Sequence, residues 1–237
     1  MAYSLISRIG SGSAEATTIT IPGTYQAGDI IIIFAFRDGS TTNASVPAGW
    51  STLTVTTDGT TCSSSIGWKI AASGAETSGT WTNATGLICH VYRGADPISP
   101  FGVQTATPTP SLTANAGTTS PSTYGATTGP NMGRMDNQWF VAVQFHRSVD
   151  TTTMNNAPTG YTNVINAQSG VTQNMVSFDT DGPVEAGFAS NTVAPGGTAS
   201  GWQTLQLPIY PAMYRTNNYQ FARCVSDGVI SLGEKIR

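Results

Sequence analysis

Charged residues are scarce in this chain of 237 residues: they make up 10% of it, and lysine occurs only twice. A helix that faces water usually needs charged residues that favour helix, so this composition can build few surface helices. Threonine, serine and asparagine fill most polar positions instead, and between glycine and proline such residues suit strands and turns. The composition therefore predicts an all-β protein.

Clusters of basic residues are missing too, and the formal net charge is −3. A nucleic-acid surface needs grouped lysine and arginine side chains that displace counterions from phosphates. The chain also has no apolar run long enough to span a membrane, and Arg8 interrupts the apolar run near the N-terminus, which is unlike a signal peptide. We therefore expect neither a nucleic-acid nor a membrane partner, and synthesis in a cytoplasm.

Residues for catalysis or metal binding are few. The three cysteines, Cys62, Cys89 and Cys224, are odd in number and form no CxxC pair, so they predict neither a disulfide framework nor a zinc site. The two histidines, His90 and His146, lack a cysteine or carboxylate at a ligand-like spacing, and no Ser-His-Asp order or Gly-x-Ser-x-Gly motif occurs. We expect no catalytic residue, no bound metal and no cofactor.

What the chain does contain is a run of seven apolar residues, Ile30 to Phe36. The run is too long for a strand with one wet face and too short to cross a membrane, so it predicts a central strand covered on both faces. Before it, Thr17 to Ile21 alternates with a period of two and predicts a half-buried first strand.

The second half of the chain repeats the order of the first. The matched features are Ile30 to Phe36 with Trp139 to Phe145, Pro47-Ala-Gly-Trp50 with Pro158-Thr-Gly-Tyr161, the strand around Trp68 with Met175 to Phe178, and Leu87 to Tyr92 with Trp202 to Tyr210. Each half alone has too few strands to cover its own apolar strand, so the halves should share a core. We predict a single antiparallel, jelly-roll-like β-sandwich built from two pseudo-repeated halves, with chance recurrence of common turns as the alternative.

The expected organisation has three parts: an N-terminal segment 1–16, a sandwich domain 17–211 and a C-terminal arm 212–237. The sandwich halves span 17–95 and 137–211. The connection between them, 96–136, holds six of the 13 prolines, and this favours extended conformations and edge strands laid across the surface.

The C-terminal arm combines basic and aromatic residues, which suits docking on a neighbouring subunit, with disorder as the alternative. Its candidate assembly contacts are Arg215, Tyr219, Phe221 and Arg223. Elsewhere, Trp50, Trp81 and Tyr161 lie near turns and are candidates for stacking on a sugar, although a tryptophan beside a turn more often caps a core.

Acidic residues mostly occupy turns. Asp179 and Asp181 belong to an Asp-Thr-Asp-Gly sequence that could contribute oxygen ligands to a calcium loop. The ligand-rich spacing of an EF-hand is missing, so turn chemistry is the preferred interpretation and calcium binding the alternative.

Several of these motifs together resemble a β-sandwich domain of structural proteins of tailed bacteriophages, of the tail-fibre, minor tail or head-decoration type. The motifs are Gly28 to Phe36, Pro47-Ala-Gly-Trp50, Trp68 to Glu76, His90-Val-Tyr-Arg-Gly94, Pro158-Thr-Gly-Tyr161 and Trp202 to Pro211. The likeness covers about residues 17–211, and it implies no catalytic residue. The second half departs from the first by having Tyr161 in place of a tryptophan and no Tyr-Arg-Gly.

The resemblance implies a non-enzymatic virion protein, most simply a tail or baseplate appendage that presents loops to the host surface and is anchored by its termini. The implied partners are other tail or capsid subunits, further copies of the chain and a host surface glycan, in a virion assembled in the host cytoplasm. A head decoration protein is the first alternative, because the chain lacks the heptads or Gly-x-y repeats of long fibre shafts. A carbohydrate-binding module is the second.

Overall fold

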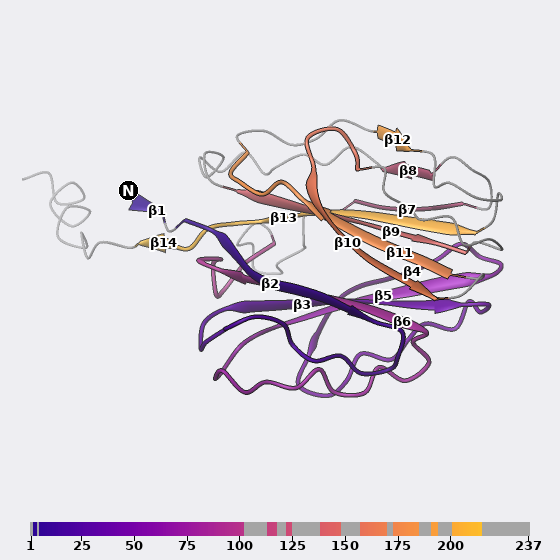
Figure 1. The fold of residues 1–237 in the computed structure, drawn as a ribbon, viewed down its shortest axis with the longest axis horizontal. Helices are drawn as coiled ribbons and strands as arrows, with labels where there is room; N and C mark the ends of the chain where they lie inside the picture. Colours follow the sequence, from indigo (N-terminus) through magenta and orange to yellow (C-terminus); the bar gives the residue numbers. More distant parts are fainter. Residues whose placement is uncertain are drawn as a thin grey trace, which may run out of the picture.

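The computed structural model describes residues 2–3, 5–101, 113–117, 122–124, 138–147, 157–169, 173–184, 191–193 and 201–214. The described residues form two five-stranded antiparallel sheets that lie face to face, with no helix among them (Figure 1). The expected all-β sandwich is therefore confirmed.

The first sheet comes from the first half of the chain, in the order β2-β6-β3-β5-β4. Its strands are β2 (Ser7–Ala14), β3 (Ile30–Asp38), β4 (Ser51–Thr57), β5 (Cys62–Ile70) and β6 (Gly86–Arg93). The apolar run predicted to be central forms β3, in the middle of the sheet, and Ile30 to Phe36 are completely buried.

The second sheet comes from residues 113–209, in the order β10-β11-β9-β13-β7. Its strands are β7 (Thr113–Gly117), β9 (Trp139–His146), β10 (Thr162–Ser169), β11 (Gln173–Asp179) and β13 (Trp202–Ile209). Two small sheets accompany them, β1 (Ala2–Tyr3) with β14 (Met213–Tyr214) and β8 (Ser122–Tyr124) with β12 (Asn191–Val193).

The two large sheets have the same connectivity. When the strands of each sheet are numbered one to five in chain order, both sheets have the spatial order one, five, two, four, three. The first strand, β2 or β7, therefore lies at one edge, and the second strand, β3 or β9, lies in the centre. This confirms two similar halves. The jelly-roll-like connectivity is refined: residues 7–93 build one large sheet and residues 113–209 build the other, so the chain passes between the two large sheets once instead of alternating between them.

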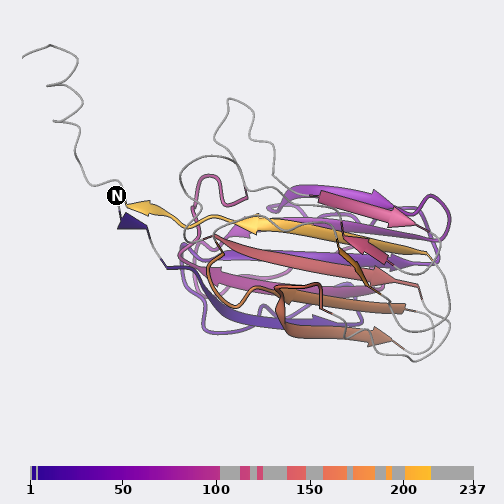
Figure 2. The same cartoon turned by 90° about the horizontal axis from the view of Figure 1, so that it is seen from above.

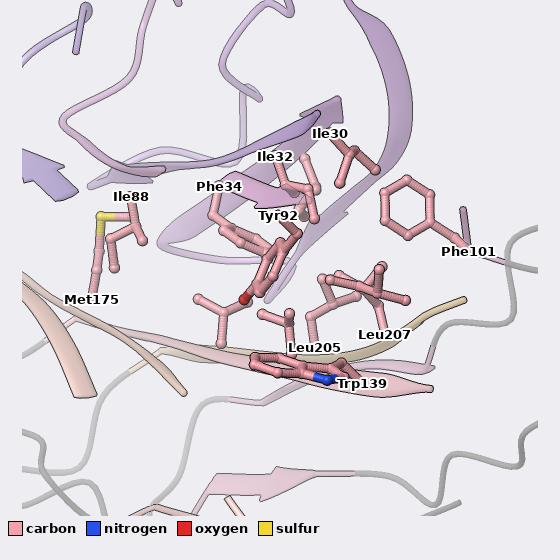
Figure 3. Packing of buried hydrophobic residues seen from close by; sticks show 14 of the residues in the cluster. Ile30, Ile32, Phe34, Ile88, Tyr92, Phe101, Trp139, Met175, Leu205 and Leu207 are labelled. Carbon is pink, nitrogen blue, oxygen red and sulfur yellow. The ribbon is translucent and has the colours of Figure 1, made fainter. Parts of the chain in front are cut away.

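Both halves contribute to the core between the sheets (Figure 3). Ile30, Ile32 and Phe34 of β3 face Leu205 and Leu207 of β13 across it. Phe36 and Phe145 stack with their ring centroids 5.4 Å apart and their planes 14° apart. Neither sheet could bury these side chains without the other, because both inner faces are apolar.

Long loops cover the outer face of the first sheet. Ile31 and Ile33, which alternate with the inward residues of β3, pack beneath Trp81 in a second apolar cluster. A smaller cluster on the outer face of the second sheet contains Phe140 and Phe178. Ile30 to Phe36 of β3 and Trp139 to Val143 of β9 are therefore apolar without interruption because both faces of these strands are covered.

The expected strand at Thr17 to Ile21 is wrong. That segment lies in the loop layer, where Ile21 is buried, and the first edge strand is β2, within the segment 1–16 that we expected to precede the domain. The sequence of β2 has little apolar alternation because glycine serves close packing: a Cβ atom on Gly10 would lie 2.8 Å from the backbone of Pro22 and Gly23.

The connection 96–136 provides an edge strand, β7, as its proline content suggested. β8 pairs with β12 outside the two large sheets. The remaining residues of the connection beyond 101 lie outside the described residues.

Replacing Phe145 with alanine tests the shared core. The variant F145A should lose about 3–5 kcal/mol of unfolding free energy, because it removes a ring buried between the sheets. Denaturant titration measures this loss, and L5A is the control, since Leu5 is 77% exposed. Equal, small losses in both variants would contradict the shared core.

Candidate functional site

A connected group of polar side chains crosses the apolar core between the sheets. His90 Nε2 lies 2.6 Å from Ser177 Oγ, and His90 Nδ1 lies 3.2 Å from the Tyr92 hydroxyl. Tyr92 donates to Asp179 Oδ2 at 3.1 Å, and Arg8 donates to the same oxygen at 2.5 Å. We call these five residues the inter-sheet network, because they join β2 and β6 of the first sheet to β11 of the second.

Strand alternation brings these residues together. His90 and Tyr92 are two apart on β6 and therefore point toward the second sheet, while Cys89 points into the outer loop layer. Ser177 and Asp179 are likewise two apart on β11 and point toward the first sheet.

Burial fixes the protonation of His90 and Tyr92. Burial, and then the positive charge of Arg8, lowers the pKa of His90 to about 3, so the imidazole is neutral near pH 7. Burial and the charge of Asp179 raise the pKa of Tyr92, so the phenol keeps its proton. Because the Tyr92 proton is donated to Asp179, we assign the proton of the neutral His90 to Nδ1, which donates it to the Tyr92 oxygen. Nε2 then accepts the hydroxyl proton of Ser177.

Arg8 supplies the positive charge that balances Asp179. Burial acts to lower the pKa of Arg8, but the hydrogen bond and the charge of Asp179 outweigh it and raise this pKa. Asp179 is completely buried, whereas the Arg8 side chain is 21% exposed. The pair therefore places a charged contact at the border of the core.

A serine beside a neutral histidine is also the pair used in nucleophilic catalysis. Here, however, Ser177 and Asp179 have no exposed surface, and His90 has 1%. A substrate could reach Ser177 only if the two sheets separated. The network therefore serves the packing of the sheets in this structure.

Asp179 and Asp181, the calcium alternative, form a turn instead. Asp179 Oδ1 accepts the backbone N–H of Asp181 at 3.0 Å, and its other oxygen is taken by Arg8 and Tyr92. Asp181 has a positive φ of 47°, and its Oδ1 atom lies 3.6 Å from Nη2 of Arg8. Within the described ranges, no group of three or more histidine, cysteine, aspartate or glutamate side chains is placed to hold a metal.

Two of the three candidate sugar-stacking residues are core residues. Trp81 is fully buried and donates its Nε1–H to the carbonyl of Ser78 at 3.1 Å. Tyr161 is 5% exposed and donates its hydroxyl to Gln206 Oε1 at 2.7 Å. Both turns fold back over an outer sheet face, so these rings close apolar clusters and cannot offer a face to a ligand.

Trp50, the third candidate, is half-buried. Its ring meets that of Trp81 edge to face at 5.8 Å, and Lys69 Nζ lies 5.4 Å from the ring centroid. Lys69 is itself paired with Glu76. Trp50 therefore retains only part of its surface for an outside contact.

The candidate assembly contacts Arg215, Tyr219, Phe221 and Arg223 lie outside the described residues. The chain just before them is described: β14 pairs with β1 as a short ribbon that projects from one end of the sandwich (Figures 1 and 2). At its base, Ala212 N–H donates to the carbonyl of Gly94 at 2.8 Å. We call this end of the sandwich the terminal end.

The opposite end also joins the two halves. Arg147 Nε lies 3.2 Å from Asp38 Oδ1, and Gln203 Nε2 donates to the carbonyl of Cys62 at 3.2 Å. The turn at Asp58 packs against Gly201, where an added Cβ would lie 2.0 Å from Asp58 Oδ2. Both ends of the sandwich therefore hold the halves together.

A shallow groove of about 440 Å³ lies between the outer loops 18–21 and 76–80. Its lining includes four threonines together with Ile19 and Ile21, and Tyr25 closes one part by donating its hydroxyl to the carbonyl of Glu76 at 3.0 Å. The only charge on its lining is Glu76, which Lys69 neutralises. The groove offers hydroxyl groups but no group suited to acid, base or nucleophilic chemistry.

Comparisons of the chain with protein-family models, curated proteins and solved structures gave no match. In the part of the chain that the structure describes, no helix is long and apolar enough to cross a membrane. The function is therefore argued from the geometry above and from the motifs of the sequence.

The inter-sheet network was not expected from the sequence. His90 and Tyr92 gave a signal, since two polar groups on one face of an apolar strand need partners. Their partners could not be identified, because that requires knowing which strand of the second sheet faces β6. Arg8 was overlooked because its segment was expected outside the domain.

Acid should destabilise the fold through His90. The unfolded chain takes up a proton at an ordinary histidine pKa of 6.5, whereas folded His90 does so only at about 3. The unfolded state therefore binds more protons in this window, and the unfolding free energy falls by a few kcal/mol as the pH drops from 6.5 to 3. Denaturant titrations at several pH values should show this slope in the wild type.

The variant H90N should lose the part of the pH dependence of unfolding free energy that comes from His90. S177A should keep it, because burial, and not the contact with Ser177, is the main cause of the lowered pKa of His90. Identical slopes in the wild type and H90N would contradict the assignment.

Removing the charge of Asp179 should lower the free energy of unfolding far more than removing the charge of Asp181. D179N leaves Arg8 without its buried partner and should lose about 3–5 kcal/mol, while D181N breaks only an exposed pair and should lose about 1 kcal/mol or less. Thermal or denaturant unfolding compares the two variants. Equal effects would show that the network does not stabilise the fold.

Proposed function

We propose that the chain is a non-enzymatic structural subunit of a tailed-bacteriophage virion, most simply a tail or baseplate appendage of fibre type. In this proposal the terminal end attaches to the particle, and the loops at the opposite end face the host surface. The resemblance of the sequence motifs suggests the class of particle, and the geometry suggests how the subunit is oriented.

The observation that carries the proposal is the ribbon formed by β1 and β14. It brings the two ends of the described chain to one end of the sandwich and extends beyond the sheets (Figure 1). The basic and aromatic arm follows directly after β14. An attachment point that gathers both ends in this way leaves the rest of the body free.

The interior supports a structural role over a chemical one. The reactive-looking group, Ser177 with His90, is buried and joined to Asp179 through Tyr92. The polar atoms of the network are used to hold one sheet to the other. A subunit exposed outside a cell benefits from such internal contacts more than from a mobile site.

The turn at Asp58 supports a preformed surface at the far end. Asp58 Oδ1 accepts backbone N–H groups from Thr60, Thr61 and Cys62 at 2.9, 2.8 and 2.9 Å. Partial burial acts to raise the pKa of Asp58, but these bonds and that of the Thr61 hydroxyl outweigh it and lower this pKa to about 2. The tip, Gly59 and Thr60, is exposed.

Truncation tests the anchoring role. A chain that lacks residues 212–237 should still fold, because the large sheets end before Pro211, but it should not enter particles. Its melting temperature and its amount in purified particles are the measurements. The control T60K changes the opposite end and should be incorporated normally; normal incorporation of the truncated chain would contradict the proposal.

Antibody labelling of particles separates the appendage from the head decoration protein. A few labels at the tail support the appendage, many labels over the head support the decoration protein, and absence from particles overturns both. A carbohydrate-binding module is the least supported alternative, because Trp81 and Tyr161 are buried.

A further inference from the structure

The outer edge of β4 has no partner within the described structure. β4 is the last strand of the first sheet and pairs only with β5. The other edge of that sheet is closed differently: Ser13 of β2 donates its hydroxyl to the carbonyl of Asn166 on β10 at 3.0 Å. Among the described residues, the backbone N–H and C=O groups on the outer side of β4 therefore have no strand partner.

Most devices that protect an edge strand are missing from β4. Its sequence, Ser-Thr-Leu-Thr-Val-Thr-Thr, contains no charge and no proline. The one protective feature is a register shift between Thr52 and Thr54, which leaves residues 54–57 in regular alternation. This regular part can accept another strand.

Side chains along the regular part suit a second copy of the same strand. Val55 lies opposite Ser65, whose hydroxyl donates to the carbonyl of Ala44 in the outer loop layer, so Val55 belongs to the outer face. It is 49% exposed, and only Leu5 and Ile98 are other large apolar side chains of the described chain with such exposure. Thr54 and Thr56 lie on the inner face.

An antiparallel pair of β4 strands centred on Val55 places residues of the same type opposite each other. Val55 then meets Val55 of the second copy, and Thr54 of each copy meets Thr56 of the other. Valine pairs and threonine pairs across strands are favourable, and no charge on the strand repels its copy. Asp58, which follows the strand, directs its carboxylate into its own turn.

We propose that β4 is a self-association edge, through which two copies of the chain join their first sheets antiparallel about a two-fold axis at Val55. The product is a continuous ten-stranded sheet, five strands from each copy. A contact limited to one strand edge is small, so the dimer dissociates on dilution. This inference does not depend on the proposed function.

Sedimentation velocity over a wide range of protein concentration tests self-association through β4. The wild type should shift from monomer to dimer as its concentration rises. V55K brings two ammonium groups together at the axis and should remain monomeric. T41K, which adds the same charge on an exposed loop, should dimerise like the wild type.

Backbone amide exchange of the wild type locates the contact without a variant. Amides of residues 54–57 should become slower to exchange at high concentration, while those of the Asp58 turn stay unchanged. A protein that is monomeric at its highest soluble concentration, or a V55K variant that folds and still dimerises, overturns the proposal.

Discussion

The fold depends on a central strand whose two faces are both apolar. Every residue from Ile30 to Phe36 is fully buried, so β3 needs a cover on each side. One cover is the second sheet, which meets Phe34 and Phe36 across the shared core, and the other is the loop layer around Trp81. Both covers are needed, because a five-stranded sheet cannot cover its own two faces.

Apolar packing alone does not define how two similar sheets should meet. The inter-sheet network adds a directional requirement: His90 must reach Ser177, and Asp179 must reach both Tyr92 and Arg8. A slip of one residue along β11 would point these groups away from the core and leave buried polar atoms without partners. We infer that the network selects one alignment of the sheets.

The sequence predicted the parts of the fold that follow from local apolar pattern. The central strands β3 and β9, the matching order of the halves and the shared sandwich are all present as expected. β2 was overlooked because Gly10 and its serine neighbours pack by their small size and not by apolar alternation. The segment Thr17 to Ile21 alternates because one of its sides, including Ile21, packs on the outer face of the first sheet. It does not pair as a strand of that sheet.

The candidate site was harder to predict for a related reason. Trp81 and Tyr161 lie near turns, and sequence alone cannot tell a turn that projects outward from one that folds back over a sheet. The inter-sheet network depends on contacts between residues 87 positions apart, as in Tyr92 with Asp179, or 171 positions apart, as in Arg8 with Asp179, and no local pattern encodes such a pairing.

Native-state hydrogen exchange under increasing denaturant tests the central claim most directly. If the two sheets share one core, amides of β3 and β9 must open in the same global event, with the same free energy and the same denaturant dependence. Exchange of β9 through a separate, less costly opening that leaves β3 protected would show that the halves are independent bodies.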